Sequence, residues 1–243
     1  MKIKKVKSYE EMSRIAADII IDKVRSNPGI NLGLATGSTP VGMYENLVKD
    51  HQEKGTSYKS VKTFNLDEYI GLSSENPNSY RSFMNEQLFN HIDIPIENTH
   101  VPHGDAKDSH QECAEYEALL KKHGGVDLQI LGIGGNGHIG FNEPGTSFQS
   151  ETHIIELAES TRRANARFFN SLEEVPTQAI TMGIASIMES KEILLLVSGE
   201  KKNQALKQLL EGDVSEDFPA SVLKTHPNVT IIADEAALSE VTV

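Results

Sequence analysis

The chain has 243 residues, of which 38% are hydrophobic and 24% charged, so it belongs with globular rather than disordered proteins. Its formal net charge is −12, since 35 acidic residues exceed 23 basic ones, which argues against a nucleic-acid partner and an anionic membrane surface. The single cysteine, Cys113, cannot form an internal disulfide, and we expect a buried structural thiol in a reducing compartment.

The N-terminus is basic but lacks the apolar run of a signal peptide, and no apolar stretch has the length of a membrane span. The sequence therefore predicts a cytoplasmic protein with no membrane partner. Neither a linker nor an internal repeat divides the chain, so we expect a single domain over residues 1–243.

The N-terminal half alternates between helical and strand patterns. Ser8 followed by Glu11 is typical of a capping box, and Thr39 is expected to cap another helix with Pro40 at its first position. The expected elements are a helix from Ser8 to the stop at Asn27-Pro28-Gly29, a strand at Ile30–Ala35, a helix from Thr39 to about Gln52, a strand at Val61–Leu66 and a helix from about Ser79 to Asn90.

The C-terminal half continues the alternation. Its expected elements are a helix around Glu112–Lys122, strands at Val126–Ile133 and Thr152–Leu157, helices at Thr161–Asn170 and Thr177–Ser190, a strand at Glu192–Val197, a helix at Lys201–Leu210 and a strand at Val229–Ala233. Short, continuous apolar strands separated by helices predict an α/β fold with a doubly wound, mostly parallel sheet and helices on both faces. In such a sheet the ligand lies beyond the carboxyl ends of the strands.

The segment Thr36-Gly37-Ser38-Thr39-Pro40 joins a predicted strand to a helix N-terminus. Free backbone N–H groups and the helix dipole favour an anion there, the Ser38 and Thr39 hydroxyls add donors, and Gly37 allows close approach of the backbone. A phosphate is the ligand that fits these features. A plain capping turn would use the same residue types, and the segment is not a Walker A motif.

Two carboxylates, Asp67 and Glu68, directly follow a predicted strand. A carboxylate at that edge can remove a carbon-bound proton if its surroundings bring its pKa toward neutrality. Asp67 is nearer to the end of the strand and is our candidate base. The alternative is a helix cap or a solvated charge.

The glycine-rich segment from Gly132 to Gly137 matches the dinucleotide fingerprint in spacing, but the residues after it leave no room for the required helix. We therefore do not expect this segment to bind a dinucleotide. What remains is a loop that offers His138 and Glu143 beside Asn136. A histidine can transfer protons near neutral pH, and a carboxylate can fix its tautomer. This set is poor for a metal, and the alternative is a surface histidine.

Further along, Arg162, Arg163 and Arg167 lie in a segment of mixed charge. Arginine binds phosphate in a bidentate manner, but most such arginines lie on a solvated helix face. Lys201 and Lys202 follow a predicted strand and again stand at its carboxyl end.

Four segments in this order resemble the glucosamine-6-phosphate deaminase family along nearly the whole chain: Thr36–Pro40, Phe64–Tyr69, Gly134–Pro144 and Asn165–Phe169. The resemblance implies a single Rossmann-like α/β domain that binds no nucleotide. It also implies conversion of glucosamine 6-phosphate and water to fructose 6-phosphate and ammonia, in amino-sugar catabolism, with neither a metal nor an organic cofactor. Such an enzyme is a hydrolase that acts on a carbon–nitrogen bond.

The same resemblance implies roles for individual residues. Asp67 would move the proton from C2 to C1, and His138 would open the pyranose ring. Glu143 and Asn136 would orient and tune the histidine. The substrate phosphate would be held by Gly37, Ser38, Thr39, Arg167 and Lys202. A lid is expected at residues 159–178, because Arg167 would bring this stretch onto the phosphate.

The sequence also departs from the family. Many members have Asp in place of Asn136, and an amide carries no negative charge, so we expect a lower pKa for His138 here. Members activated by N-acetylglucosamine 6-phosphate have a basic patch where this chain has the largely acidic and apolar stretch 151–156. We therefore predict no such activation, and a monomer or small homo-oligomer.

Two other functions are compatible with this kind of fold. In 6-phosphogluconolactonases a Thr-Ala-Ser-Leu-Phe-Pro run typically follows the Gly-His of the loop, whereas this chain has Ile-Gly-Phe-Asn-Glu-Pro and keeps Asp67. Sugar-phosphate sensors of transcriptional regulators carry a DNA-binding module, for which no segment here has the room or the charge.

Overall fold

The computed structural model describes residues 1–241. Seven strands form the central sheet in the order β1-β10-β9-β6-β2-β3-β5, and every pair in it is parallel. Their bounds are β1 (Lys2–Val6), β2 (Asn31–Leu34), β3 (Lys62–Asn65), β5 (Thr99–His100), β6 (Leu128–Leu131), β9 (Glu192–Val197) and β10 (Val229–Asp234). The predicted strands of the parallel sheet are thus confirmed: β2, β3 and β6 are shorter than expected, β9 has the expected bounds, and β10 is one residue longer.

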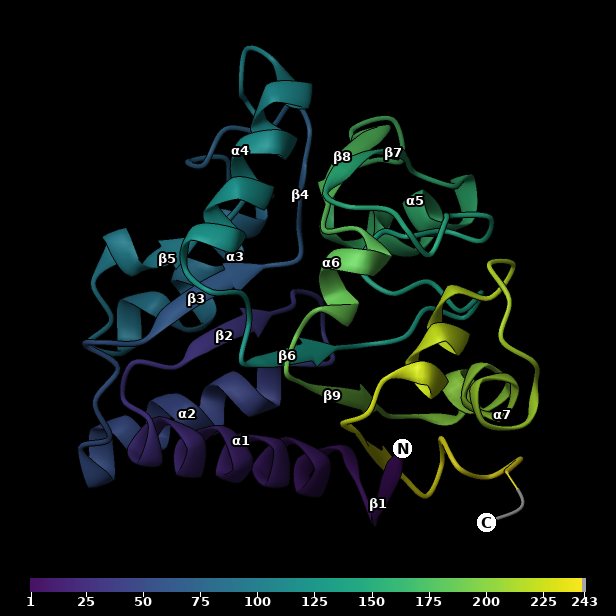
Figure 1. Cartoon of the computed structure of the whole chain (residues 1–243), viewed down its shortest axis with the longest axis horizontal. Helices are drawn as coiled ribbons and strands as arrows, with labels where there is room; N and C mark the ends of the chain where they lie inside the picture. The colour runs from purple at the N-terminus through teal and green to yellow at the C-terminus, as the bar shows by residue number, and fades with distance from the viewer. Residues whose placement is uncertain (242–243) are drawn as a thin grey trace.

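Helices cover both faces of the sheet, as expected for a doubly wound fold (Figure 1). One hydrophobic cluster packs α1 (Tyr9–Ser26), α2 (Val41–Lys54) and α3 (Tyr80–Gln87) against one face. A second cluster packs α4 (Ser109–Lys122), α6 (Ile184–Met188) and α7 (Asn203–Glu211) against the other. Short 3₁₀ segments lie at η1 (Phe89–His91), η2 (Ile96–Asn98), η3 (Ala166–Phe168), η4 (Glu200–Lys202) and η5 (Pro219–Thr225).

A second, antiparallel sheet has the order β4-β8-β7, with β4 at Asp67–Tyr69, β8 at Gln178–Thr181 and β7 at His153–Glu156. The helix predicted at Thr177–Ser190 is therefore wrong in its first part: residues 178–181 form β8, and only Ile184–Met188 is helical. Asp67 lies in a strand rather than in a loop, because the chain leaves the central sheet at Leu66 and pairs with β8.

The start of α2 also differs from the expectation. Pro40, not Thr39, is the N-cap residue, and its own side chain makes no capping hydrogen bond. The physical reason lies in α1, where the Tyr9 hydroxyl accepts a hydrogen bond from the Gly42 N–H at 2.9 Å. The Ser8 cap of α1 is confirmed, since its hydroxyl accepts from the Glu11 N–H.

Cys113 is buried in α4, as predicted, and burial raises the pKa of its thiol to about 11. A thiol with a raised pKa is a weak nucleophile at neutral pH. Within residues 1–241, none of the helices combines the length and the apolarity that crossing a membrane requires.

The sheet order creates a switch point between β2 and β6. From β2 the chain proceeds outward through β3 to β5, whereas β6 lies on the other side of β2 and leads to β9 and β10. Loops that leave neighbouring strands in opposite directions open a crevice at the carboxyl ends of the strands. The loops after β2 and β6 carry two of the motifs singled out in the sequence.

Candidate active site

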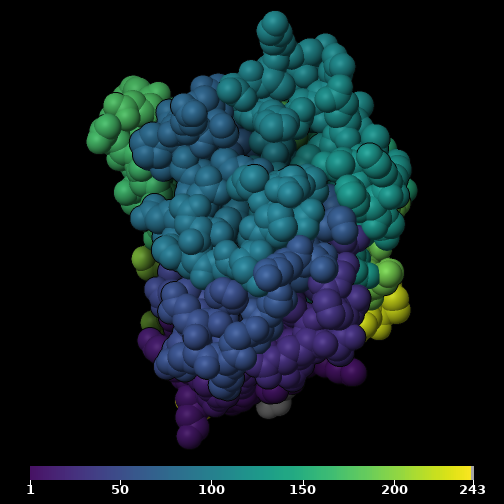
Figure 2. Space-filling model, turned by 90° about the vertical axis from the view of Figure 1, so that its left-hand side faces the viewer, coloured from purple at the N-terminus to yellow at the C-terminus, as the bar shows by residue number. Residues whose placement is uncertain are grey.

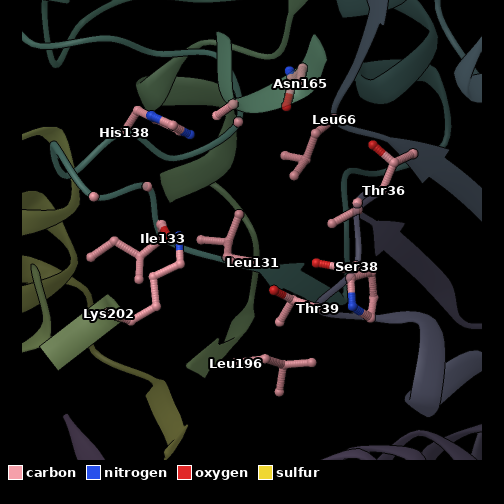
Figure 3. A pocket seen from close by; sticks show the side chains of 18 of the residues that line it. Thr36, Ser38, Thr39, Leu66, Leu131, Ile133, His138, Asn165, Leu196 and Lys202 are labelled. Carbon is pink, nitrogen blue, oxygen red and sulfur yellow. Dashed lines mark hydrogen bonds between the residues drawn. The ribbon is translucent and has the colours of Figure 1, made fainter. Parts of the chain in front are cut away.

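A cavity of about 900 Å³ opens at this switch point. Its walls come from the loops after β2, β6 and β9, from the start of β4 and from the segment that contains α5 (Glu159–Asn165) and η3. His138 and Lys202 lie on the opposite side of the cavity from Ser38 and Thr39 (Figure 3). Segments far apart in the sequence therefore converge on a single site.

The five candidate phosphate ligands all line this cavity: Gly37, Ser38, Thr39, Arg167 and Lys202. Gly37 has a φ of +87°, which favours glycine. The Tyr9 hydroxyl donates to the Ser38 carbonyl at 2.9 Å and holds this loop in place. The Arg167 guanidinium donates to the Ser38 hydroxyl at 3.4 Å, so α5–η3 reaches across to the loop after β2.

Lys202 brings a second positive charge to the same region. Its ammonium group donates to the Ile133 carbonyl at 2.7 Å, which directs the side chain along the loop after β6. Burial, and then the charge of Arg167, lower the pKa of Lys202. An anion between the two groups would relieve their repulsion, since opposite charges nearby stabilise the charged form of each.

The other two arginines of the segment take no part in the cavity. Arg162 donates to the Leu172 and Val175 carbonyls at 3.0 and 2.9 Å and closes the loop that follows η3. Arg163 is exposed and pairs with Glu159 one turn away. Of the three arginines considered in the sequence, only Arg167 is placed to meet a ligand.

The two adjacent carboxylates, Asp67 and Glu68, have different surroundings. The Glu68 carboxylate accepts hydrogen bonds from the backbone N–H groups of Tyr69, Tyr80 and Arg81 at 2.9 to 3.0 Å, so it caps the start of α3. Asp67 lines the cavity, and burial, with the nearby charge of Glu68, raises its pKa to about 8. A carboxylate with a pKa close to the working pH is suited to proton transfer.

His138 is held through its Nδ1 atom, which lies 2.7 Å from the Asn136 side-chain oxygen. The Asn136 amide nitrogen donates to the Glu143 carboxylate at 2.8 Å, so its oxygen must face the imidazole. An amide oxygen only accepts, which places the proton on Nδ1 and leaves Nε2 free to take up or give a proton. Asn136 and Glu143 thus fix the tautomer of His138.

The charge state of His138 is also set by its surroundings. Burial lowers its pKa, the Glu143 carboxylate 3.8 Å from Nδ1 acts in the opposite direction, and Lys202 lowers the pKa further. This lowering is relative to a free histidine and has burial as its first cause; the lower pKa expected relative to members with Asp at position 136 stays a prediction. The imidazole is therefore neutral at pH 7 and able to act as a base.

Thr161 is a site residue that sequence reasoning missed. Its hydroxyl donates to the second oxygen of the Glu143 carboxylate at 2.5 Å, and both side chains are buried. Thr161 belongs to α5, and no motif in the sequence pairs it with the loop after β6. Among residues 1–241, no group of three or more His, Cys, Asp or Glu side chains is arranged to hold a metal ion.

Comparison with known proteins supports a single family. The sequence model described as "Glucosamine-6-phosphate isomerases/6-phosphogluconolactonase" matches residues 5–232. A glucosamine-6-phosphate deaminase of Geobacillus sp. (strain WCH70) is 61% identical over 98% of this chain and 95% of its own length. Glucosamine-6-phosphate deaminase 1 of Bacillus subtilis (strain 168) is 52% identical over 98% of this chain and 99% of its own length.

Solved structures agree with this likeness. A monomeric glucosamine-6-phosphate deaminase superposes with a TM-score of 0.97 at 52% identity and covers 99% of this chain and 100% of its own. A 6-phosphogluconolactonase from Trypanosoma brucei superposes with a TM-score of 0.80 at 17% identity, covering 99% and 98%. The second likeness shows a shared fold.

Proposed function

The chain belongs to the glucosamine-6-phosphate isomerase/6-phosphogluconolactonase family, and we propose that it converts glucosamine 6-phosphate and water to fructose 6-phosphate and ammonia. It acts as a glucosamine-6-phosphate deaminase, in line with relatives of that name at 52–61% identity over nearly its full length. One observation carries the assignment: a single cavity contains both a buried carboxylate, Asp67, and an oriented imidazole, His138.

The phosphate group, at one end of the substrate, binds between the loop after β2 on one side of the cavity and Lys202 on the other. Arg167 and Lys202 supply positive charge, and the Ser38 and Thr39 hydroxyls with the backbone at Gly37 supply donors. Holding this end fixes the distance from the phosphate to the reacting carbons. Such positioning can contribute on the order of 7–11 kcal/mol to lowering the barrier.

His138 catalyses the ring opening. Its free Nε2 takes the proton from the anomeric hydroxyl and returns a proton to the ring oxygen, which breaks the bond between C1 and that oxygen. Asn136 and Glu143 keep the imidazole in the required tautomer and stabilise the imidazolium during the transfer. A proton transfer of this kind accelerates a reaction by roughly 10²–10⁴-fold.

Asp67 catalyses the isomerisation. Its carboxylate removes the C2 proton of the open-chain aldose while the ammonium group on C2 gives a proton to the C1 oxygen, which yields an enolamine. The Asp67 carboxyl group then returns its proton to C1. The resulting iminium carbon at C2 adds water and releases ammonia, leaving the ketose. The chain and the substrate supply every proton-transfer group, so this route uses neither a metal nor an organic cofactor.

The remaining parts of the proposal concern the chain as a whole. We propose one domain over residues 1–243, with residues 159–178 as a lid that carries Arg167 onto the phosphate. In Figure 2 the green part of the chain, which contains this stretch, projects at the upper left side of the molecule. The likeness to a deaminase described as monomeric favours a monomer over a small homo-oligomer. A cytoplasmic location stays a prediction.

The test is to treat the purified protein with a chelator, add glucosamine 6-phosphate and measure both ammonia and fructose 6-phosphate. Equal amounts of the two products are expected. No ammonia together with rapid hydrolysis of 6-phosphogluconolactone would move the chain to the lactonases. Tight binding of sugar phosphate without either turnover would favour a sensor.

A further inference from the structure

The segment formed by α5 and η3 contacts both ends of the cavity. At one end Arg167 donates to the Ser38 hydroxyl, beside the proposed phosphate position. At the other end Thr161 donates to Glu143. Thr161 and Arg167 lie six positions apart on one short helical stretch, and Asn165 between them also lines the cavity. The segment is therefore placed to link the two ends.

Three consecutive hydrogen bonds connect Thr161 to the imidazole. The Thr161 hydroxyl donates to Glu143 Oε1 at 2.5 Å, and Glu143 Oε2 accepts from the Asn136 amide nitrogen at 2.8 Å. The Asn136 oxygen then accepts from His138 Nδ1 at 2.7 Å. Thr161 is 6% exposed and Glu143 7%, so water cannot easily replace the threonine hydroxyl as a donor.

Each member of this chain of hydrogen bonds determines the orientation of the next. The threonine hydroxyl holds one carboxylate oxygen, and this fixes the plane of the Glu143 carboxylate. The second carboxylate oxygen selects the orientation of the Asn136 amide, and the amide selects the tautomer of His138. Without the threonine hydroxyl the Glu143 carboxylate could rotate, and the Asn136 amide could then flip. The single tautomer of His138 therefore depends on the hydrogen bond from Thr161 to Glu143.

We propose that Thr161 is a positioning residue that couples the placement of α5 to the tautomer of His138 through Glu143 and Asn136. The inference rests on the proposed function, because it assigns a purpose to the oriented imidazole. Its consequence is that the imidazole is ready for ring opening only when α5 lies against the cavity. The same segment carries Arg167, so binding of a phosphate and readiness of the histidine occur together.

The experiment compares Thr161→Val, which removes the hydroxyl at nearly constant shape, with Thr161→Ser, which keeps it. Turnover of glucosamine 6-phosphate gives kcat and KM, and ¹⁵N NMR of the histidine ring nitrogens gives the tautomer of His138, assigned with a His138→Gln variant. In Thr161→Val we expect kcat to fall about 10- to 100-fold, the loss that fits one hydrogen bond to a charged group. We expect KM within about twofold of the parent, since the phosphate contacts remain, and a mixture of His138 tautomers.

Thr161→Ser should restore kcat to within about threefold, since its hydroxyl can make the same bond. Ser160→Ala is the matched control, because the Ser160 side chain is exposed on the same helix and should leave kcat and the NMR spectrum unchanged. If Thr161→Val unfolds, Thr161→Ala and the serine variant give the same comparison.

Two results would overturn the inference: an unchanged His138 tautomer in Thr161→Val, or a higher KM with an unchanged kcat. A parent protein that shows the single tautomer but produces no ammonia would instead refute the proposed function. The tautomer measurement needs no turnover, so the two failures are distinguishable.

Discussion

The imidazole of His138 lies directly against the backbone of Gly134, where an added Cβ would stand 2.2 Å from the ring atoms Nδ1 and Cε1. The Gly134 N–H donates to the His138 carbonyl at 2.9 Å, so the loop after β6 folds back on itself at this point. The ring reaches the Asn136 oxygen because position 134 has no side chain. The glycine of this loop is thus part of what orients the histidine.

Replacing Gly134 with alanine should therefore displace the imidazole. We expect Gly134→Ala to lower kcat at least about tenfold, because the ring can no longer keep its bond to Asn136. Gly135→Ala is the matched control, since a Cβ at position 135 meets nothing within 4 Å and its φ is not positive. Steady-state kinetics of both variants checks this, and equal activity of the two would contradict it.

Arg167 and Arg163 form a second matched pair. Removing Arg167 takes a charged donor from the proposed phosphate site, and we expect Arg167→Ala to raise KM about 10- to 100-fold with a smaller effect on kcat. Arg163→Ala in the adjoining helix α5 removes only an exposed ion pair with Glu159 and should leave KM unchanged. The assignment of Arg167 would fail if both variants raised KM equally.

Asp67→Asn should abolish nearly all turnover and still bind sugar phosphate, because an amide keeps the shape of the carboxyl group but cannot accept the C2 proton. Initial rates and binding of fructose 6-phosphate by calorimetry measure the two effects. A variant that keeps most of its kcat would show that another group is the base.

The same substitution should change the stability of the fold with pH. The pKa of Asp67 is raised from 3.8 to about 8 by burial, so between these values the unfolded chain releases a proton that the folded protein retains. The free energy of unfolding of the parent therefore falls as pH rises, by up to about 1.4 kcal/mol for each pH unit. In Asp67→Asn the amide does not titrate, so this contribution to the fall is absent.

We expect the stability advantage of Asp67→Asn to grow between pH 5 and pH 8, measured by urea unfolding of both proteins. Glu68 is present in each and contributes to both curves. A difference that stays constant with pH would mean that the carboxyl group is ionised in the folded protein.

Asn136→Asp should raise the pKa of His138. The new carboxylate would replace an amide whose nitrogen donates to Glu143, so two carboxylates would face each other beside the imidazole and favour its charged form. Titration of the His138 signal by NMR in the parent and in Asn136→Asp measures this shift. An unchanged or lower His138 pKa would contradict the expectation.

Added N-acetylglucosamine 6-phosphate should leave turnover unchanged. The stretch 151–156 contains the acidic residues Glu151 and Glu156 at its two ends, and Lys121 already pairs with Glu151. A phosphate has little attraction to such a surface. Rates at subsaturating glucosamine 6-phosphate, with and without the acetylated sugar, check this, and a several-fold rise would refute it.

The parallel sheet was predictable because its strands are short, apolar runs bounded by turn residues. Of the second sheet, only β7 was predicted, within the strand expected at Thr152–Leu157. β8 was not, because Gln178–Thr181 is too short for its period to distinguish a strand from the helix that follows it. β1 was not predicted, for another reason. Its sequence is Lys-Ile-Lys-Lys-Val and only Val6 is buried, so it lacks the apolar run that is typical of a core strand.

The candidate site was predictable to the extent that its residues follow strand ends. Asp67, His138 and Lys202 all do, and sheet topology brings such positions together. The distinction between Asp67 and Glu68 depends on the backbone N–H groups of Tyr80 and Arg81 at the start of α3, a contact that no local pattern reveals. The bond from Thr161 to Glu143 likewise joins elements whose contact exists only in the folded chain.

The edge strand β1 affects how copies of the chain meet one another. An open sheet edge presents unpaired backbone groups that can pair with a neighbouring molecule and begin aggregation. On β1 the exposed side chains include Lys2, Lys4 and Lys5, so two copies approaching edge to edge would bring like charges together. This edge of the sheet thus resists the intermolecular strand pairing that leads to fibrils.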